Sequence, residues 1–274
     1  MSKKQSSGGS LGDTLRSMFA TSVIFIALIV AILIYKFVMG SPLNFEGGNP
    51  DGQPLPGNYL GIIYKGGPIV PFLIMLLLTV VTFAIERAVT LRRIRGKSRI
   101  NVFVKKLQGL LGENRIEEAI GECDKNRGSL ANVMRAGLIK FKDLEADATL
   151  EKDQKIVALQ QVFEEATALE LPMMSKNIVI FSSIASLSVL TGLMGTVFGM
   201  IRAFAALAQA GAPDALALAT GISEALINTA FGIGGSLLAI VFYNLFMTKI
   251  DAMTFKIDEA GFSLVQTFSA RQKR

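Results

Sequence analysis

Five polar side chains lie within two strongly apolar stretches of the chain. Thr196 and Arg202 belong to the first stretch, and Glu224, Asn228 and Thr229 belong to the second. Hydroxyl, amide and carboxyl groups inside a membrane helix can bond to one another or solvate a moving proton, and an ionisable residue there indicates a functional site. The two stretches, which a short polar link joins, therefore predict a transmembrane helical hairpin that carries the chemistry of the protein.

Glu224 is the most costly of these residues to place in a membrane. If the hairpin is centred near Ala210, Thr196 and Glu224 are equally distant from its centre, so straight antiparallel helices place them at a similar depth, about 20 Å from the outer turn. A charged carboxylate there costs roughly 2.5–3.5 kcal/mol. We therefore expect Glu224 to be protonated, paired with a cation or facing a water-filled cavity, and not to face lipid.

Small residues recur on one face of each predicted hairpin helix. Ser188 begins this stripe in the first helix and Thr229 begins it in the second, at spacings of three or four residues. Such spacing lets two membrane helices approach closely. We assign to this packing role Gly192, Gly195, Gly199, Gly232 and Gly235. Arg202 also lies on the first stripe, where its long side chain can either extend to the headgroups or take part in the polar site.

The composition indicates a membrane protein and leaves little for enzyme chemistry. Hydrophobic residues make up 51% of the 274 residues, and the mean hydropathy is +0.46. The chain has no His, no Trp and one Cys. It therefore cannot form an internal disulfide, a His-based metal site or a His-dependent catalytic triad. We expect no catalytic residue, no metal and no cofactor.

Apolar segments long enough to cross a bilayer predict an all-α polytopic membrane protein with four transmembrane helices. Residues 1–40 form an N-terminal tail and an additional span, Met18–Met39. A cleaved signal sequence is the alternative, but its apolar part is usually about 7–15 residues long and this one is longer. Residues 41–67, rich in Pro and Gly, predict a periplasmic loop of turns, and residues 68–91 predict the second span.

The third and fourth spans form the hairpin at 177–248. Residues 92–176 are more polar, with apolar side chains at helical spacing, and predict long helices that extend into a cytoplasmic bundle. We expect Cys123 to pack between these helices. Residues 249–274 place apolar side chains on one face and predict a cytoplasmic helix that continues the fourth span.

The distribution of charge predicts the orientation in the membrane. The net charge is +6, and the basic excess lies mainly in residues 1–17, in residues 92–176 and after Thr248. All three regions fall on one side of a four-span topology, and excess positive charge marks the cytoplasmic side. We therefore expect both termini to be cytoplasmic and no nucleic-acid partner. Glu86 and Arg87, at the inner end of the second span, are interpreted as interfacial anchors.

Three ordered motifs carry a resemblance to a known family. They are Gly192-Leu-Met-Gly-Thr-Val-Phe-Gly-Met-Ile-Arg-Ala-Phe204, Gly221-Ile-Ser-Glu-Ala-Leu-Ile-Asn-Thr-Ala-Phe-Gly232 and Val241-Phe-Tyr-Asn244. The chain here resembles the MotA/TolQ/ExbB proton-channel family, most closely its ExbB/TolQ branch. Weaker similarity at 66–87 and 123–137 extends the resemblance over roughly residues 60–250.

The resemblance implies a subunit of a bacterial inner-membrane motor. It implies a homopentamer in the lipid bilayer around the transmembrane helices of a dimeric, single-span ExbD/TolR-like partner, whose membrane Asp would carry the proton. It also implies that Thr196, Thr229 and Glu224 line the proton pathway, and we place Arg202 and Asn228 along that pathway or at its mouth. The proton motive force would then energise TonB-dependent outer-membrane transport through a TonB-like or Tol-like protein.

The sequence also allows alternatives to this function. A Tol-type envelope-maintenance motor or a gliding motor of the same family stays open. A secondary transporter is disfavoured because the four spans show no duplicated halves, and a non-conducting scaffold has no need of Glu224 at mid-depth. The chain departs from the family pattern at its additional N-terminal span, at Val189 in place of a frequent Pro, and at Arg202, which is neutral in some members.

Overall fold

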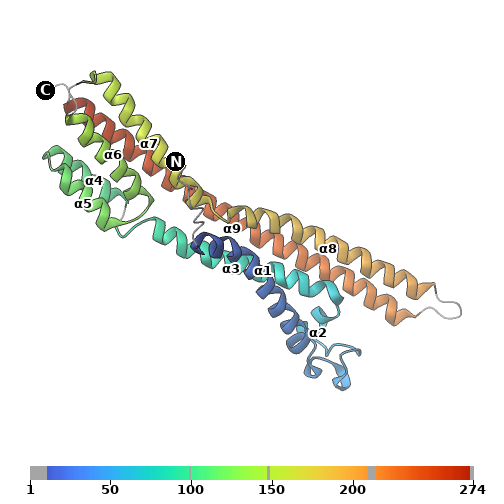
Figure 1. Ribbon diagram of the computed structural model, residues 1–274. Helices are drawn as coiled ribbons and strands as arrows, with labels where there is room; N and C mark the ends of the chain where they lie inside the picture. The colour runs from blue at the N-terminus through green and yellow to red at the C-terminus, as the bar shows by residue number, and fades with distance from the viewer. Residues whose placement is uncertain (1–10, 99, 147–148, 209–213, 272–274) are drawn as a thin grey trace, which may run out of the picture. The chain divides into compact units, whose positions relative to one another are not determined.

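The computed structural model describes residues 11–98, 100–146, 149–208 and 214–271. Within these residues, four helical segments are long and apolar enough to cross a membrane, and no strand is formed beyond one isolated bridge (Figure 1). The four segments are Thr21–Met39, Gly67–Ile94, Lys152–Leu207 and Ala215–Arg271. The predicted all-α membrane fold is confirmed. The start of the predicted N-terminal tail, most of the hairpin link and the last three residues lie outside the described ranges.

The chain divides into two compact units. The first contains the chain up to Ala84 together with Val179–Tyr243, and the second contains Ile85–Ile178 and Asn244–Arg274. α3 (Val70–Ile94) and α9 (Ala215–Arg271) each contribute long segments to both units. Each unit has its own buried apolar side chains and is described by itself.

In the first unit, the additional N-terminal span packs against α3. It consists of α1 (Leu11–Leu33) followed without interruption by the π-helix η1 (Ile34–Met39). The buried side chains that join these elements are Ala31, Met39, Val70 and Ile74. The additional span is thus held to the second span by close apolar packing.

The loop at 41–67 is more ordered than its composition predicted. It contains the short helices η2 (Pro42–Asn44), η3 (Glu46–Gly48) and α2 (Tyr59–Tyr64), and η4 (Gly67–Ile69) leads into α3. Buried Asn44 donates from Nδ2 to the carbonyls of Val38 and Met39 at 2.7 and 2.8 Å and accepts from Asn58 at 3.0 Å. Side-chain amides therefore fix the turns that Pro and Gly allow.

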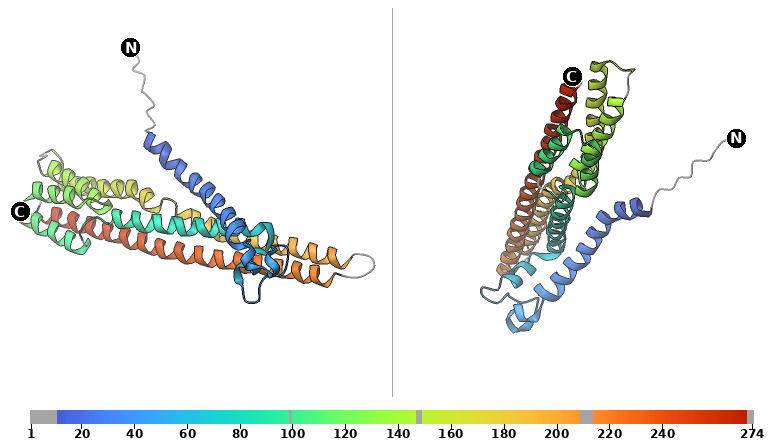
Figure 2. Two further views of the ribbon diagram at one scale, coloured as in Figure 1. Left: turned by 90° about the horizontal axis from the view of Figure 1, so that it is seen from below. Right: turned by 90° about the vertical axis from the view of Figure 1, so that its left-hand side faces the viewer.

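Two antiparallel helices form the rest of the first unit. α8 (Ile178–Leu207) matches the predicted third span, and α9 begins at Ala215, close to the predicted start of the fourth. Figure 2 shows α8 and α9 side by side along the hairpin. α9 continues for 57 residues as one helix. The predicted continuation of the fourth span by an amphipathic helix is therefore observed.

The second unit is a helical bundle around an apolar core. Its elements are α4 (Ile100–Gly112), α5 (Ile116–Asn126), α6 (Ser129–Ala146), α7 (Lys152–Ser175) and the end of α9. The ring of Phe141 contacts that of Phe268 edge-on, with centroids 4.7 Å apart. Cys123 is buried among these helices with a free thiol. Burial raises the pKa of this thiol to about 12, which keeps it protonated and unreactive.

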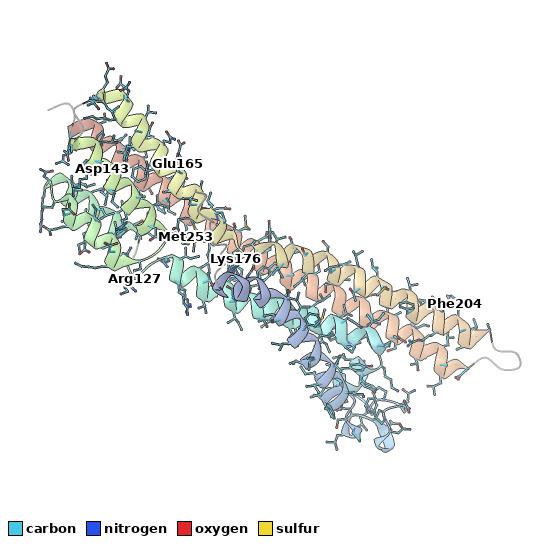
Figure 3. The ribbon with its side chains drawn as sticks, in the orientation of Figure 1. Arg127, Asp143, Glu165, Lys176, Phe204 and Met253 are labelled. Atoms are coloured by element: carbon cyan, nitrogen blue, oxygen red, sulfur yellow. The ribbon has the colours of Figure 1, made fainter. Side chains whose placement is uncertain are left out.

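A short turn separates α7 from α8. Pro172 lies inside α7, which ends at Ser175. The chain then turns at Lys176, labelled in Figure 3, and at Asn177, which has a φ of 60°. Asparagine tolerates this left-handed conformation better than most residues, so the helix break falls there.

Candidate functional site

The backbones of α8 and α9 touch along a row of glycines. A Cβ on Gly192 would lie 3.0 Å from the Cα of Gly232, and a Cβ on Gly199 would lie 2.7 Å from the backbone nitrogen of Ala225. Gly195 makes room for the side chain of Asn228 in the same way. No larger residue fits at these positions without moving a helix backbone, which explains why the sequence places glycine there.

Gly232 and Gly235 extend the contact away from the hairpin link. A Cβ on Gly232 would lie 2.7 Å from the carbonyl oxygen of Ser188, and one on Gly235 would meet the Ser188 hydroxyl. By contrast, nothing lies within 4 Å of a Cβ built on Gly234. Each glycine given a packing role thus has a close neighbour on the opposite helix.

Two threonine hydroxyls meet across this contact. The Oγ1 atoms of Thr196 on α8 and Thr229 on α9 form a short hydrogen bond. The Thr196 hydroxyl also lies 3.2 Å from the carbonyl oxygen of Gly192, and the Thr229 hydroxyl lies 3.1 Å from that of Ala225. Because a hydroxyl has one hydrogen, one threonine donates to the other and the second donates to a carbonyl. The pair can therefore adopt two opposite hydrogen-bond directions.

Glu224 forms an ion pair with Arg202. Nη1 of Arg202 donates to both carboxylate oxygens of Glu224, each at 2.8 Å. The Glu224 side chain is 4% exposed, whereas that of Arg202 is 54% exposed. Of the three states expected for Glu224, the structure shows pairing with a cation. Arg202 belongs to the polar site and does not merely extend to the headgroups.

Gly67 closes the site from the start of α3. Its φ of 78° suits glycine. A Cβ there would meet the Glu224 carboxylate and would lie 3.4 Å from Nη1 of Arg202. Gly67 is not among the site residues predicted from the sequence, although Gly66, Gly67 and Pro68 at the start of a span are a signal of an unusual backbone.

Asn228 connects the hairpin to the same turn. Its side chain is completely buried, and Nδ2 donates to the carbonyl oxygen of Gly66 at 2.8 Å. Its Oδ1 atom has no hydrogen-bond partner in the described part of the chain. Asn228 thus joins α9 to the turn before α3, and its Oδ1 atom can still accept a hydrogen bond.

The predicted equal depth of Thr196 and Glu224 is wrong. Thr196 pairs with Thr229, and Glu224 pairs with Arg202. The Thr196–Thr229 pair therefore lies about one and a half helical turns further from the hairpin link than Glu224. The assumed centre at Ala210 was too early, so the actual register moves Glu224 toward the link.

Arg87 differs from the predicted interfacial anchor. It is 2% exposed, and it donates from Nε and Nη2 to the two carboxylate oxygens of Glu86 at 2.7 and 2.6 Å. Thr90 donates to the same carboxylate at 2.9 Å. Burial of the guanidinium argues against an anchor in contact with water and headgroups. Among the described residues, no three His, Cys, Asp or Glu side chains converge to hold a metal ion.

Comparison with known proteins gives one family. Residues 126–259, which include α8, the start and middle of α9 and the polar residues of the hairpin, match the model of the MotA/TolQ/ExbB proton channel family. An ExbB-like biopolymer transport protein of Synechocystis sp. is 36% identical over 85 residues, which are 30% of this chain and 40% of that protein.

Two further relatives are aligned over longer segments. The Tol-Pal system protein TolQ of Pseudomonas aeruginosa is 23% identical over 158 residues, 58% of this chain and 68% of that protein. The biopolymer transport protein ExbB of Pseudomonas putida is 26% identical over 202 residues, 73% of this chain and 60% of that protein. The alignments with the two ExbB-type relatives thus span less than two thirds of their lengths.

Proposed function

Through residues 126–259 this chain belongs to the MotA/TolQ/ExbB proton channel family, and we propose that it is the channel subunit of a bacterial inner-membrane motor. In this proposal it acts with an ExbD/TolR-like, single-span partner and uses the proton motive force to energise TonB-dependent outer-membrane transport. The ExbB-type relatives, named as biopolymer transport proteins, support the transport role.

The observation that carries the proposal is the Thr196–Thr229 hydroxyl pair. Both residues are only partly buried in the single chain, so a neighbouring helix can reach them. The two hydrogen-bond directions of the pair let it donate to or accept from a carboxyl group on that helix. A partner Asp that gains and loses a proton during each cycle needs such a neighbour.

Exposed apolar side chains on α8 support an oligomer of this chain. α8 exposes large apolar side chains, including Phe198, Ile201 and Phe204, the last labelled in Figure 3. We propose that such faces pack against copies of the chain in a pentamer that surrounds the partner dimer. Both termini are then cytoplasmic, as the distribution of basic residues favours.

Arg202 and Glu224 have a separate part in this proposal. Their ion pair lies on the hairpin-link side of the threonine pair, so it forms the outer end of the proton pathway. Protonation of Glu224 weakens its hold on the Arg202 guanidinium, which is already half exposed. Asn228 holds this end of α9 to the turn before α3.

A Tol-type role is the second candidate. The alignment with TolQ covers a larger share of that protein than the alignments with the ExbB-type relatives cover of theirs. Deletion of the gene distinguishes the two roles. Loss of receptor-dependent uptake with an intact envelope supports the TonB role, whereas a leaky outer membrane with normal uptake supports the Tol role.

Replacement of the two hydroxyls tests the channel assignment. We expect Thr196→Val and Thr229→Val each to lower proton-driven function at least about tenfold, since valine keeps the shape and removes the proton donor and acceptor. The measurements are pH-indicator flux in vesicles that contain the chain with its partner, and the uptake or envelope assay in cells.

Thr220→Val is the matched control for this test. Thr220 is on the same helix and donates to the carbonyl oxygen of Leu216 at 2.8 Å, as Thr229 does to that of Ala225. No second hydroxyl bonds to Thr220 among the described residues. Unchanged flux in both pair variants, with the protein fully assembled, would remove the threonines from the pathway.

A further inference from the structure

A cavity in the second unit combines cationic and apolar walls. It has a volume of about 680 Å³ and lies between the end of α3, the start of α4 and α9. Four basic residues line it: Arg92, Arg95, Lys249 and Lys256. No Asp or Glu is among its lining residues. A cavity with this lining favours an anion.

Three of the four cations are not neutralised. In the described ranges, no carboxylate lies within ion-pair distance of Arg92, Arg95 or Lys249, and these side chains are exposed. Lys256 forms an ion pair with Glu259 at 2.7 Å, and Glu259 is not itself among the residues that line this cavity. Two guanidinium groups and one ammonium group are therefore available to an incoming ligand.

Apart from Asn101, the other lining residues are apolar. Leu91, Phe246 and Met253, the last labelled in Figure 3, lie beside the cations, together with Ile100 and Val102 from α4. Val102 is 61% exposed. Leu91 and Phe246 are already buried, so the apolar surface that an acyl chain can cover is that of exposed Val102 and of half-buried Ile100 and Met253. A small hydrated anion gains nothing from this surface.

The cavity lies at the polar ends of two membrane-spanning segments. The second candidate span ends at Ile94, between Arg92 and Arg95. On α9, Phe246 and Lys249 flank the predicted end of the fourth span. Residues at such positions lie at the level of the lipid headgroups.

We propose that this cavity binds an anionic phospholipid, with its phosphodiester on Arg92, Arg95 and Lys249 and the first part of its acyl chains against the apolar wall. Basic pockets between transmembrane helices suit such headgroups, and a guanidinium group can hold two phosphate oxygens at once. The bound lipid joins α3, α4 and α9 of the second unit. The site is separate from the threonine pair and the ion pair of the first unit.

Lipid titration of the purified chain tests the proposal. The chain in mild detergent is titrated with phosphatidylglycerol or phosphatidylcholine of identical acyl chains, and bound lipid is counted by native mass spectrometry. We expect phosphatidylglycerol to be retained at least about tenfold more tightly, because charge-assisted bonds to phosphate oxygens depend on the net anionic headgroup. Equal retention of the two lipids overturns the proposal, and this arm needs no variant.

Matched double variants locate the site. Arg92→Gln/Arg95→Gln removes two cations from the cavity, and Arg93→Gln/Lys97→Gln removes two exposed cations of the same segment that do not line it. We expect at least about tenfold weaker retention of phosphatidylglycerol in the first variant and less than about threefold change in the second. Equal losses would mean general attraction to basic residues and would overturn the site.

A competition experiment separates a lipid from free phosphate. Inorganic phosphate and glycerol 3-phosphate carry the headgroup charge without acyl chains. We expect neither to displace phosphatidylglycerol at low millimolar concentration. Displacement by either compound would make the cavity a site for soluble phosphate compounds and would overturn the lipid assignment.

Discussion

Glycine has different neighbours in the two units of this protein. In the hairpin of α8 and α9, Gly192 and Gly199 face backbone atoms of the opposite helix. In the bundle of the second unit, Gly137 faces the ring of Phe163, and Gly261 faces the same ring from α9. The hairpin thus gains its contact by bringing two backbones together, whereas the bundle makes room for a large side chain.

Polar side chains also have different positions in the two units. The hairpin pairs Thr196 with Thr229 and Arg202 with Glu224 across the helix contact. In the bundle, ion pairs such as Lys106–Glu122 and Arg135–Asp124 lie on the surface, where such pairs contribute about 0–1 kcal/mol. Since lipid offers no hydrophobic driving force between helices, close approach and polar pairs must hold the hairpin, while burial of apolar side chains holds the bundle.

Removal of the Phe163 ring tests the bundle side of this contrast. We expect Phe163→Ala to destabilise the bundle by about 3–5 kcal/mol, because the ring is buried between α6 and α9 and leaves a cavity. Denaturant unfolding followed by circular dichroism measures the loss. Phe255→Ala is the control, since Phe255 on α9 is 65% exposed. Equal effects of the two variants would show that the ring does not hold the bundle together.

A single methyl group tests the hairpin side. Gly199→Ala places a Cβ 2.7 Å from the Gly221 carbonyl oxygen and the Ala225 nitrogen, and we expect a loss of about 1–3 kcal/mol from this overpacking. The control Gly234→Ala lies in open space on α9 and should be neutral or slightly stabilising, because alanine favours helix. Thermal unfolding in detergent compares the two. A neutral Gly199→Ala would show that the backbones are not in contact.

The smallest expected effect at neutral pH concerns the core around Cys123. Its pKa is raised from 9.0 to about 12, mainly by burial and to a lesser degree by Asp124. Below pH 9 the thiol is protonated in both folded and unfolded chains and adds no pH dependence. Between about pH 9 and 12 only the unfolded chain loses the proton, so the stability should fall by up to about 1.4 kcal/mol per pH unit.

Thiol labelling measures the same burial. Because Cys123 is the single cysteine, labelling at pH 8 should be slow in the folded protein and fast in denaturant. Cys123→Ser should lose the alkaline part of the pH dependence that the wild type shows. Rapid labelling of the folded protein would contradict the dry core that distinguishes the bundle from the polar hairpin.

Periodicity in the sequence was sufficient to predict the helices, but it did not predict how the two helices of the hairpin are aligned against each other. The predicted apolar face of the C-terminal helix is buried at Ile250, Ile257, Ala260, Leu264 and Phe268. This succeeds because one strong periodic signal fixes a helix face. The depth of Glu224 was wrong because the register of a hairpin depends on the path of its link and on glycine contacts between helices, which no single-helix pattern contains.

Some local contacts were also not predicted from the sequence. A capping box of Glu151 and Gln154 begins α7, and the sequence alone does not select it because several neighbouring polar residues could fill that role. The threonine and arginine positions of the site were found from the apolar context of their side chains. Gly67 was missed because it lies far from the hairpin in sequence and acts by lacking a side chain.

Gly67 has a consequence for how this chain can vary. Two independent demands meet there, since the backbone has a positive φ and the space of a Cβ is filled by the Glu224 carboxylate. A saturation library at this codon should therefore return glycine alone, even though the residue offers no functional group to a proton. Tolerance to substitution in this protein is thus set as strictly by the turn before α3 as by the hairpin that contains the charges.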